Sequence, residues 1–153
     1  MNTRRAFLVV LLAALVGFSI FAYLLSRVSQ IEEASATRAQ ARIDSVRALY
    51  ADPTPIMTFD ETRPAPPDTR VAKIETLHVL LYRGPLEGLL QVDVPIWFIR
   101  LKAPAAQYML RNTDVDLAEL GLTADVLRSY GPAIVADEER PNGDRLFMWT
   151  DAP

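Results

Sequence analysis

The sequence predicts an α+β protein in which an N-terminal transmembrane helix and a helical stalk precede a small, mostly antiparallel β-sheet domain with helices on one face. Three features of the 153 residues carry this prediction: an uncharged run over 6–25, five prolines within 51–70, and alternating apolar and polar residues from 71 onward. The order expected within residues 71–153 is strand, strand, helix, helix, strand, strand. This length allows one small folded domain.

Residues 6–25 are expected to cross a membrane once. The run contains no charged side chain, and a helix of twenty residues extends about 30 Å, the thickness of the hydrocarbon core of a bilayer. Arg4 and Arg5 precede the run, so residues 1–5 are expected in the cytoplasm and the C-terminal domain in the periplasm or outside the cell. The lipid bilayer is therefore a predicted partner. Among sixteen basic side chains only two are lysine, a usage associated with bacteria of high GC content, so a bacterial inner membrane is the expected location.

A cleaved signal peptide is the alternative for the same run. Ala34-Ser35-Ala36 has the small-residue form of a cleavage site, but it lies nine residues beyond Leu25. A signal peptide has an apolar core of about 7–15 residues with the cleavage site close behind it. The longer core favours an uncleaved signal-anchor.

A stalk and a linker are expected between the membrane and the domain. Residues 26–50 lack proline and glycine and are rich in Ala, Arg, Glu and Gln, which predicts that the helix continues beyond the bilayer, with a thin apolar stripe. That stripe suits a helix lying on its own domain or standing in water better than one pairing with another membrane protein. Residues 51–70 form an extended, proline-rich linker. Within it, Ile56, Met57 and Phe59 are expected to dock as a short extended strand, either on the domain or on a partner, and the domain is preferred.

Two strands are expected at the start of the domain. Alternation from Val71 predicts a first strand that Arg83-Gly84-Pro85 ends, and apolar residues on both of its faces predict burial on both sides. A second strand is expected over residues 89–102. Pro95 places this strand at an edge or gives it a bulge, because proline has no N–H to donate to a ladder.

Capping and turn patterns predict the remaining elements. Pro104 suits the first turn of a helix, and Thr123 suits the N-cap of a later one. Between them, Asp116 and Glu119 have the spacing of a capping box at the start of a short turn. Asn142-Gly143 predicts a hairpin that joins the last two strands.

Composition excludes several classes of function. The chain has no cysteine, which removes disulfides, thiolate metal sites and cysteine nucleophiles. Residues 71–153 carry eight basic and twelve acidic side chains, the wrong balance for a nucleic-acid-binding surface. We therefore expect no nucleic acid among the partners.

Two residue groups invite a chemical interpretation. His78 is the only histidine, and a hydrogen-bonded structural histidine is preferred to a general base because no nucleophile motif such as G-x-S-x-G accompanies it. Asp114, Asp116 and Glu119 have the spacing of a weak cation site, but an EF-hand loop needs a glycine and further oxygen ligands that this stretch lacks. Helix capping explains these acids better, so we expect no catalytic residue, cofactor or metal ligand.

An excess of large apolar side chains indicates an interaction surface. Residues 96–99 and 146–149 place such side chains on both faces of their expected strands, so a second face of the sheet needs a cover. That cover is either another molecule or the helices and docked linker of the domain itself. The candidate surface residues are Trp97, Ile99, Phe147, Met148 and Trp149.

The function expected from these observations is that of an accessory subunit of a bacterial envelope assembly that binds another membrane or envelope protein, or a second copy of itself. The alternative from another class is an envelope enzyme or ligand sensor with a site near His78. The layout of a basic leader, an apolar helix, a polar helix and a four-stranded domain is similar in outline to type IV pilins and pseudopilins, and an atypical subunit of that kind is a further alternative. Ala6 and Leu11 stand where those families usually have glycine and glutamate.

Overall fold

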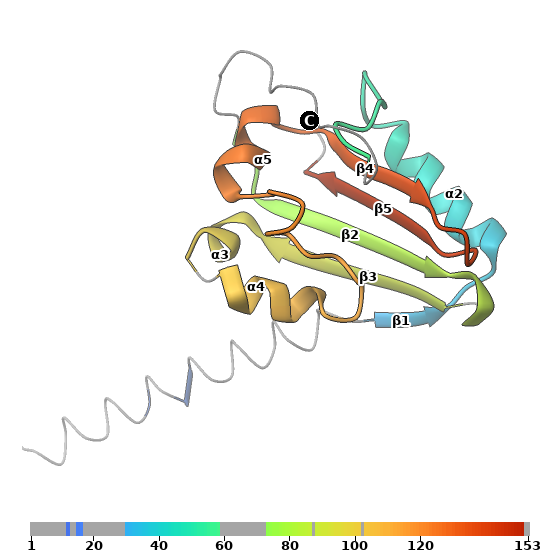
Figure 1. The fold of residues 1–153 in the computed structure, drawn as a ribbon, viewed down its shortest axis with the longest axis horizontal. Helices are drawn as coiled ribbons and strands as arrows, with labels where there is room; N and C mark the ends of the chain where they lie inside the picture. The colour runs from blue at the N-terminus through green and yellow to red at the C-terminus, as the bar shows by residue number, and fades with distance from the viewer. Residues whose placement is uncertain are drawn as a thin grey trace, which may run out of the picture.

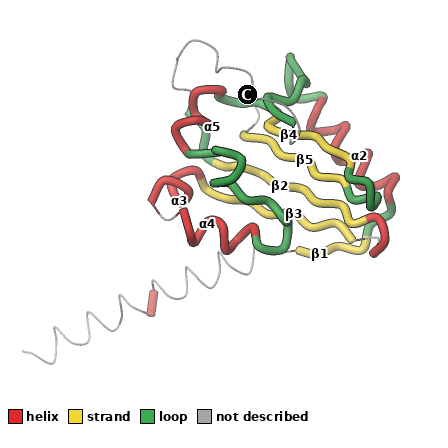
Figure 2. Tube along the Cα trace, in the orientation of Figure 1, coloured by secondary structure: helices red, strands yellow, loops and turns green. Residues whose placement is uncertain are grey.

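Two β-hairpins joined side by side form the centre of the protein. The computed structural model describes residues 12, 15–16, 30–58, 73–86, 88–101 and 103–151. Within them, five strands pair antiparallel in the order β1-β3-β2-β5-β4, and helices lie on both faces (Figures 1 and 2). The strands are β1 (Gln30–Glu33), β2 (Thr76–Arg83), β3 (Gly88–Pro95), β4 (Ile134–Glu139) and β5 (Arg145–Thr150). The expected α+β class and antiparallel pairing are confirmed.

The turns of the two hairpins lie against each other. The 3₁₀ turn Gly84–Leu86 connects β2 to β3, and the predicted Asn142-Gly143 turn connects β4 to β5. A Cβ atom on Gly84 would lie 2.5 Å from the carbonyl oxygen of Gly143, so only glycine allows this approach of the two backbones. The Gly84 N–H also donates to the Asp144 carboxylate at 3.1 Å. The contact fixes one hairpin relative to the other.

One face of the sheet is covered by three short helices. They are α3 (Ile96–Leu101), α4 (Ala103–Leu110) and α5 (Ala124–Tyr130). Alternate residues of β2 meet them, and the buried cluster on this face includes Leu77, Val79, Leu81, Ile99, Leu110, Leu127, Leu146 and Met148. The start of the linker also contributes, because the N–H groups of Ile56 and Met57 donate to the carbonyls of Ile134 and Val135 in β4. The expected docking of the linker is confirmed for Ile56 and Met57, whereas Phe59 lies outside the described residues.

The other face is covered by α2 (Ala36–Arg47), which Ser35 caps through its hydroxyl. Ala39 and Ile43 are the buried residues of the helix, and they belong to a second apolar cluster with Leu80, Phe147 and Trp149. Small alanine side chains let a helix approach a sheet closely. The thin apolar stripe of this segment therefore faces its own domain.

The continuous helical stalk predicted over residues 26–50 is not found in the described part of that range, residues 30–50. Residues 30–33 are a strand paired with β3, and α2 starts only after them, so helices occupy both faces of the sheet and not one. The structure therefore places residues 30–50 in the same folded unit as residues 73–151. The predicted span over 6–25 lies almost entirely outside the described residues. No helix in the part of the chain that the structure describes has the length and apolar character to cross a bilayer.

The expected second strand over 89–102 is also wrong in its second half. β3 ends at Pro95, and α3 begins at the next residue, Ile96. The Ile96 N–H donates a hydrogen bond of 2.8 Å to the Glu75 carbonyl. Ile96 and Ile99 are buried at helical spacing, whereas Trp97 is 54% exposed. The aromatic and β-branched residues favour a strand locally, but the helix buries both isoleucines against the core.

Local capping predictions for the helical region are confirmed. The Asp116 carboxylate accepts hydrogen bonds from the N–H groups of Ala118 and Glu119. Thr123 caps α5 through the N–H of Val126, and Gly131 ends the helix with a positive φ of 71°. The Asp116 carboxylate and the Thr123 hydroxyl thus serve the backbone, as expected, whereas Asp114 lies 3.7 Å from Arg140.

Phe147→Ala should lower the free energy of unfolding by about 3–5 kcal/mol, because the ring is fully buried between the sheet and α2. Trp97→Ala is the matched aromatic control and should cost less than about 1 kcal/mol, since more than half of its side chain is exposed. Denaturant titration of the full chain in detergent, followed by circular dichroism, measures both. Equal losses would contradict the two-layer core.

A fragment of residues 71–153 should fail to fold cooperatively, because it lacks α2 and exposes the apolar face that includes Leu80, Phe147 and Trp149. A fragment of residues 30–153 retains that cover and should unfold in a single transition. Thermal melts and near-ultraviolet circular dichroism of the two fragments make the comparison. A cooperative melt of the shorter fragment would show that α2 is dispensable.

Candidate functional site

Most of the residues predicted to form an interaction surface belong to the core. Ile99, Phe147, Met148 and Trp149 are buried, the first and third on the face of α3 to α5 and the other two beneath α2. Trp97 alone of the five is exposed. The helices and linker of the chain cover both faces of the sheet, which is the alternative that the sequence left open.

Trp97 lies beside a groove at the end of the sheet where β2 begins. The groove has a volume of about 550 Å³ and is formed where the segment before β2, the junction of β3 with α3, and α5 meet. Its lining residues are Lys73, Ile74, Glu75, Thr76, Pro95, Ile96, Trp97 and Arg128. We call this feature the α3–α5 groove.

The α3–α5 groove combines an aromatic wall with charged groups. The indole of Trp97 packs edge-on against Phe98, with ring centroids 5.5 Å apart, which holds the exposed ring in place. Arg128 has a contact of 3.9 Å with Asp125, and Lys73 has one of 3.4 Å with Glu75. Ion pairs at an exposed site contribute little stability, so both cations are available to a carboxylate on a partner.

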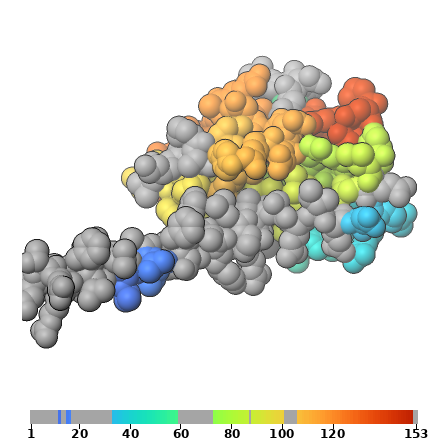
Figure 3. Space-filling view, turned by 90° about the horizontal axis from the view of Figure 1, so that it is seen from below, coloured from blue at the N-terminus to red at the C-terminus, as the bar shows by residue number. Residues whose placement is uncertain are grey.

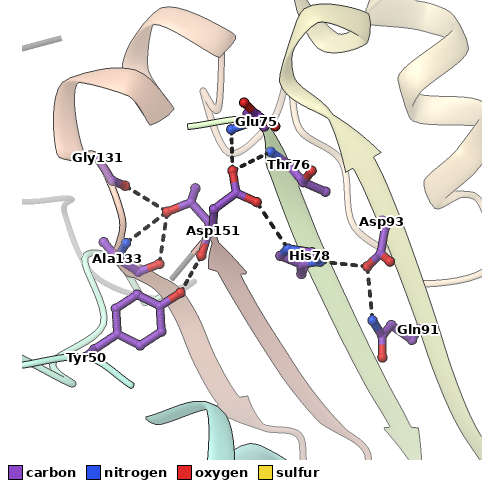
Figure 4. Close-up of polar contacts among 10 residues, drawn as sticks. Tyr50, Glu75, Thr76, His78, Gln91, Asp93, Gly131, Ala133 and Asp151 are labelled. Carbon is purple, nitrogen blue, oxygen red and sulfur yellow. Dashed lines mark hydrogen bonds and ion pairs between the residues drawn. The ribbon is translucent and has the colours of Figure 1, made fainter. Parts of the chain in front are cut away.

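His78 forms a second polar cluster, on the face of the sheet that α2 covers in part (Figure 4). Its Nδ1 atom lies 2.8 Å from the Asp93 carboxylate and its Nε2 atom 3.5 Å from the Asp151 carboxylate. The imidazole stacks on the indole of Trp149, with centroids 4.9 Å apart and planes at 19°. Both ring nitrogens are therefore engaged by acids, with the ring between them.

Hydrogen bonds extend from this cluster to the ends of β2 and β5. The Asp151 carboxylate accepts the backbone N–H groups of Glu75 and Thr76, the latter at 2.8 Å. The hydroxyl of Tyr50 donates to the carbonyl of Thr150. Burial, with the negative charge of Asp151 nearby, raises the pKa of Tyr50 to about 12. The tyrosine thus stays a hydrogen-bond donor throughout the physiological range.

The pKa of Asp93 reflects opposing influences. Burial alone raises it, but hydrogen bonds from His78 and Gln91 and the positive charges of His78 and Arg42 outweigh burial, so the pKa lies below its ordinary value. Arg42 reaches this site through Gln91, to whose amide oxygen it donates at 2.6 Å. The carboxylate is therefore ionised wherever the protein is studied near neutral pH.

The His78 arrangement suits a structural role better than catalysis. A general base needs a ring nitrogen directed at a substrate or nucleophile, and here Nε2 faces the Asp151 carboxylate. Asp93 and Asp151 approach opposite nitrogens of the ring, so the three side chains do not converge on one point. Among the described ranges, no group of three histidine, cysteine, aspartate or glutamate side chains is placed to hold a metal ion.

The acid partners of His78 were not predicted from the sequence, although one of them follows from the register of the expected hairpin. A hairpin that turns over Gly84–Leu86 places position 78 opposite position 93, and the observed register pairs them. Asp151 could not be found in this way, because its approach depends on pairing of β5 with β2. The α3–α5 groove was missed because residues 96–101 were expected in a strand.

Comparisons with known proteins do not assign the chain to a family. No protein-family model matches the sequence, and neither a curated protein nor a solved structure matches it.

Asp93 should contribute stability that depends on pH. Because its pKa is lower in the folded chain than in the unfolded one, the contribution is complete above about pH 4 and is lost as the pH falls through the folded value. Urea midpoints of the wild type and Asp93→Asn should differ near neutral pH and converge in acid. Asp125→Asn, at a largely exposed position, is the control and should follow the wild type. A difference that persists unchanged in acid would contradict this assignment.

Proposed function

We propose that this chain is a single-span, membrane-anchored accessory subunit of a bacterial envelope assembly, and that its α+β domain, on the outer side of the inner membrane, binds a partner protein through the α3–α5 groove. The span over residues 6–25 and the cytoplasmic Arg4 and Arg5 supply the anchor and its orientation. An anchored domain meets partners in the same membrane at a high effective concentration, so a modest contact area suffices.

The observation that carries this proposal is the exposure of Trp97. The other large side chains of the expected interaction surface are buried, whereas this indole is 54% exposed at the edge of a groove. Tryptophan is among the residues most enriched at the energetic centres of protein interfaces, because it combines a large apolar area with one N–H donor. An exposed indole fixed by Phe98 loses little conformational freedom on binding.

The chemistry of the α3–α5 groove indicates the kind of segment it would bind. Ile74, Pro95 and Ile96 contribute apolar surface. The charged lining residues are two cations, Lys73 and Arg128, and one acid, Glu75, so the groove has a net positive charge. A volume of about 550 Å³ accommodates one or two side chains of a protein segment. The partner segment is therefore one that presents an apolar side chain next to a carboxylate.

A photo-crosslinking amino acid at position 97 of the full chain, expressed in its own membrane, should form a discrete adduct with one partner protein. The same amino acid at position 86 is the matched control, because Leu86 is also exposed but lies in the turn at the far end of β2. Trp97→Ala should weaken capture of that partner by about 30-fold, the effect of losing a hot-spot residue of about 2 kcal/mol, while the thermal melt stays close to that of the wild type.

Arg128→Glu is the second test, because it reverses one charge of the groove without changing its apolar lining. It should weaken capture of the same partner. Adducts of equal yield from positions 97 and 86, or full capture by Trp97→Ala, would refute the proposal.

A further inference from the structure

The folded domain begins very close to the predicted end of the transmembrane span. The apolar run ends at Leu25 and β1 begins at Gln30, so four residues separate bilayer and sheet. Four residues reach at most about 14 Å when fully extended. Because β1 pairs with β3, this edge of the sheet is held at the membrane surface if the anchor proposed above is correct.

Helix α4 lies along the same edge of the molecule. Figure 1 shows α4 and β1 at the lower border of the domain, next to β3, and α4 contacts β3 directly. In the view from below, α3 and α4 and the segment after them, coloured yellow to orange, occupy this side (Figure 3). A bilayer within reach of β1 is therefore also within reach of α4.

The charge of this part of the chain is opposite to that of the rest of the domain. Of the eight basic and twelve acidic side chains in residues 71–153, three basic ones and none of the acidic ones fall within 94–113. The three are Arg100, Lys102 and Arg111. Basic side chains close to a bilayer are attracted to anionic lipids.

An exposed aromatic side chain accompanies these charges. Tyr108 of α4 is 57% exposed, and the guanidinium of Arg111 lies over its ring at 4.2 Å from the centroid. Arg100 is exposed as well. Tyrosine with arginine is typical of the headgroup region, where the ring meets apolar atoms and its hydroxyl meets water.

We propose that the surface formed by Arg100, Tyr108 and Arg111 rests on the headgroups of an anionic bilayer. The proposal depends on the membrane anchor and goes beyond it, because an anchor alone leaves the domain free to turn. Contact through α4 fixes the orientation of the domain. It leaves the α3–α5 groove, at the end of the sheet where β2 begins, directed along the membrane toward other embedded proteins.

The absence of cysteine makes the proposal directly testable with single labelled positions in the full chain. Asn112→Cys places a fluorophore next to the proposed surface, and Asn142→Cys places it on the exposed turn between β4 and β5. Both labelled proteins are reconstituted separately into vesicles of phosphatidylcholine and phosphatidylglycerol that contain no other protein. The vesicles also contain a lipid with a spin label on its headgroup. Fluorescence at position 112 should be quenched several-fold more than at position 142. Vesicles of phosphatidylcholine alone, or high salt, should reduce the difference.

A charge reversal tests the role of the arginine. Arg111→Glu should reduce quenching at position 112, whereas Lys73→Glu, an equal reversal at a position that lines the α3–α5 groove, should not. Equal quenching at positions 112 and 142 in anionic vesicles would refute the surface contact.

Carbonate extraction of the same vesicles separates the two proposals. If the chain resists extraction but position 112 is not quenched, the anchor stands and the surface contact is wrong. If the chain is extracted, the proposed anchor is wrong, and so is the surface contact that depends on it.

Discussion

The structure depends on covering both faces of a sheet that is apolar on each side. β5 directs Leu146 and Met148 to one side and Phe147 and Trp149 to the other, and its neighbour β2 does the same. A sheet of this kind is stable only between two layers. Helices α3 to α5 supply one layer, and α2, from a distant part of the sequence, supplies the other.

A largely buried network of ion pairs around Asp137 fixes the position of α2 on the sheet. The Asp137 carboxylate of β4, only 10% exposed, accepts from Arg47 at the end of α2 and from Arg145 of β5. Arg145 also donates to Gln40 on the helix. Loss of Arg47 would leave the Asp137 carboxylate paired with Arg145 alone, so the full set of contacts forms only when α2 lies in its observed position.

Features set by neighbouring residues could be predicted from the sequence, and those set by distant contacts could not. Asn142-Gly143 and Thr123 determine a turn and a cap through their own backbone preferences, and both occur as expected. Residues 30–33 carry no local reason to form a strand and do so because β3 offers them an edge. Residues 96–101 have strand propensity but form a helix, because a helix buries Ile96 and Ile99 together. The same limit applies to the groove: Trp97 was expected on a surface and is exposed, but the lining of the groove depends on the unexpected helix α3 and on α5.

The order of strands in the sheet limits how early this domain can fold during synthesis. β5, which comes last among the described strands, lies between β2 and β4, and α2 packs on side chains that β5 contributes. A ribosome delivers the N-terminal elements first. The apolar face of α2 therefore has no complete surface to pack on until residues 145–150 have been made. Folding of this domain therefore waits for β5, and the apolar faces of the earlier segments stay exposed to aggregation until then.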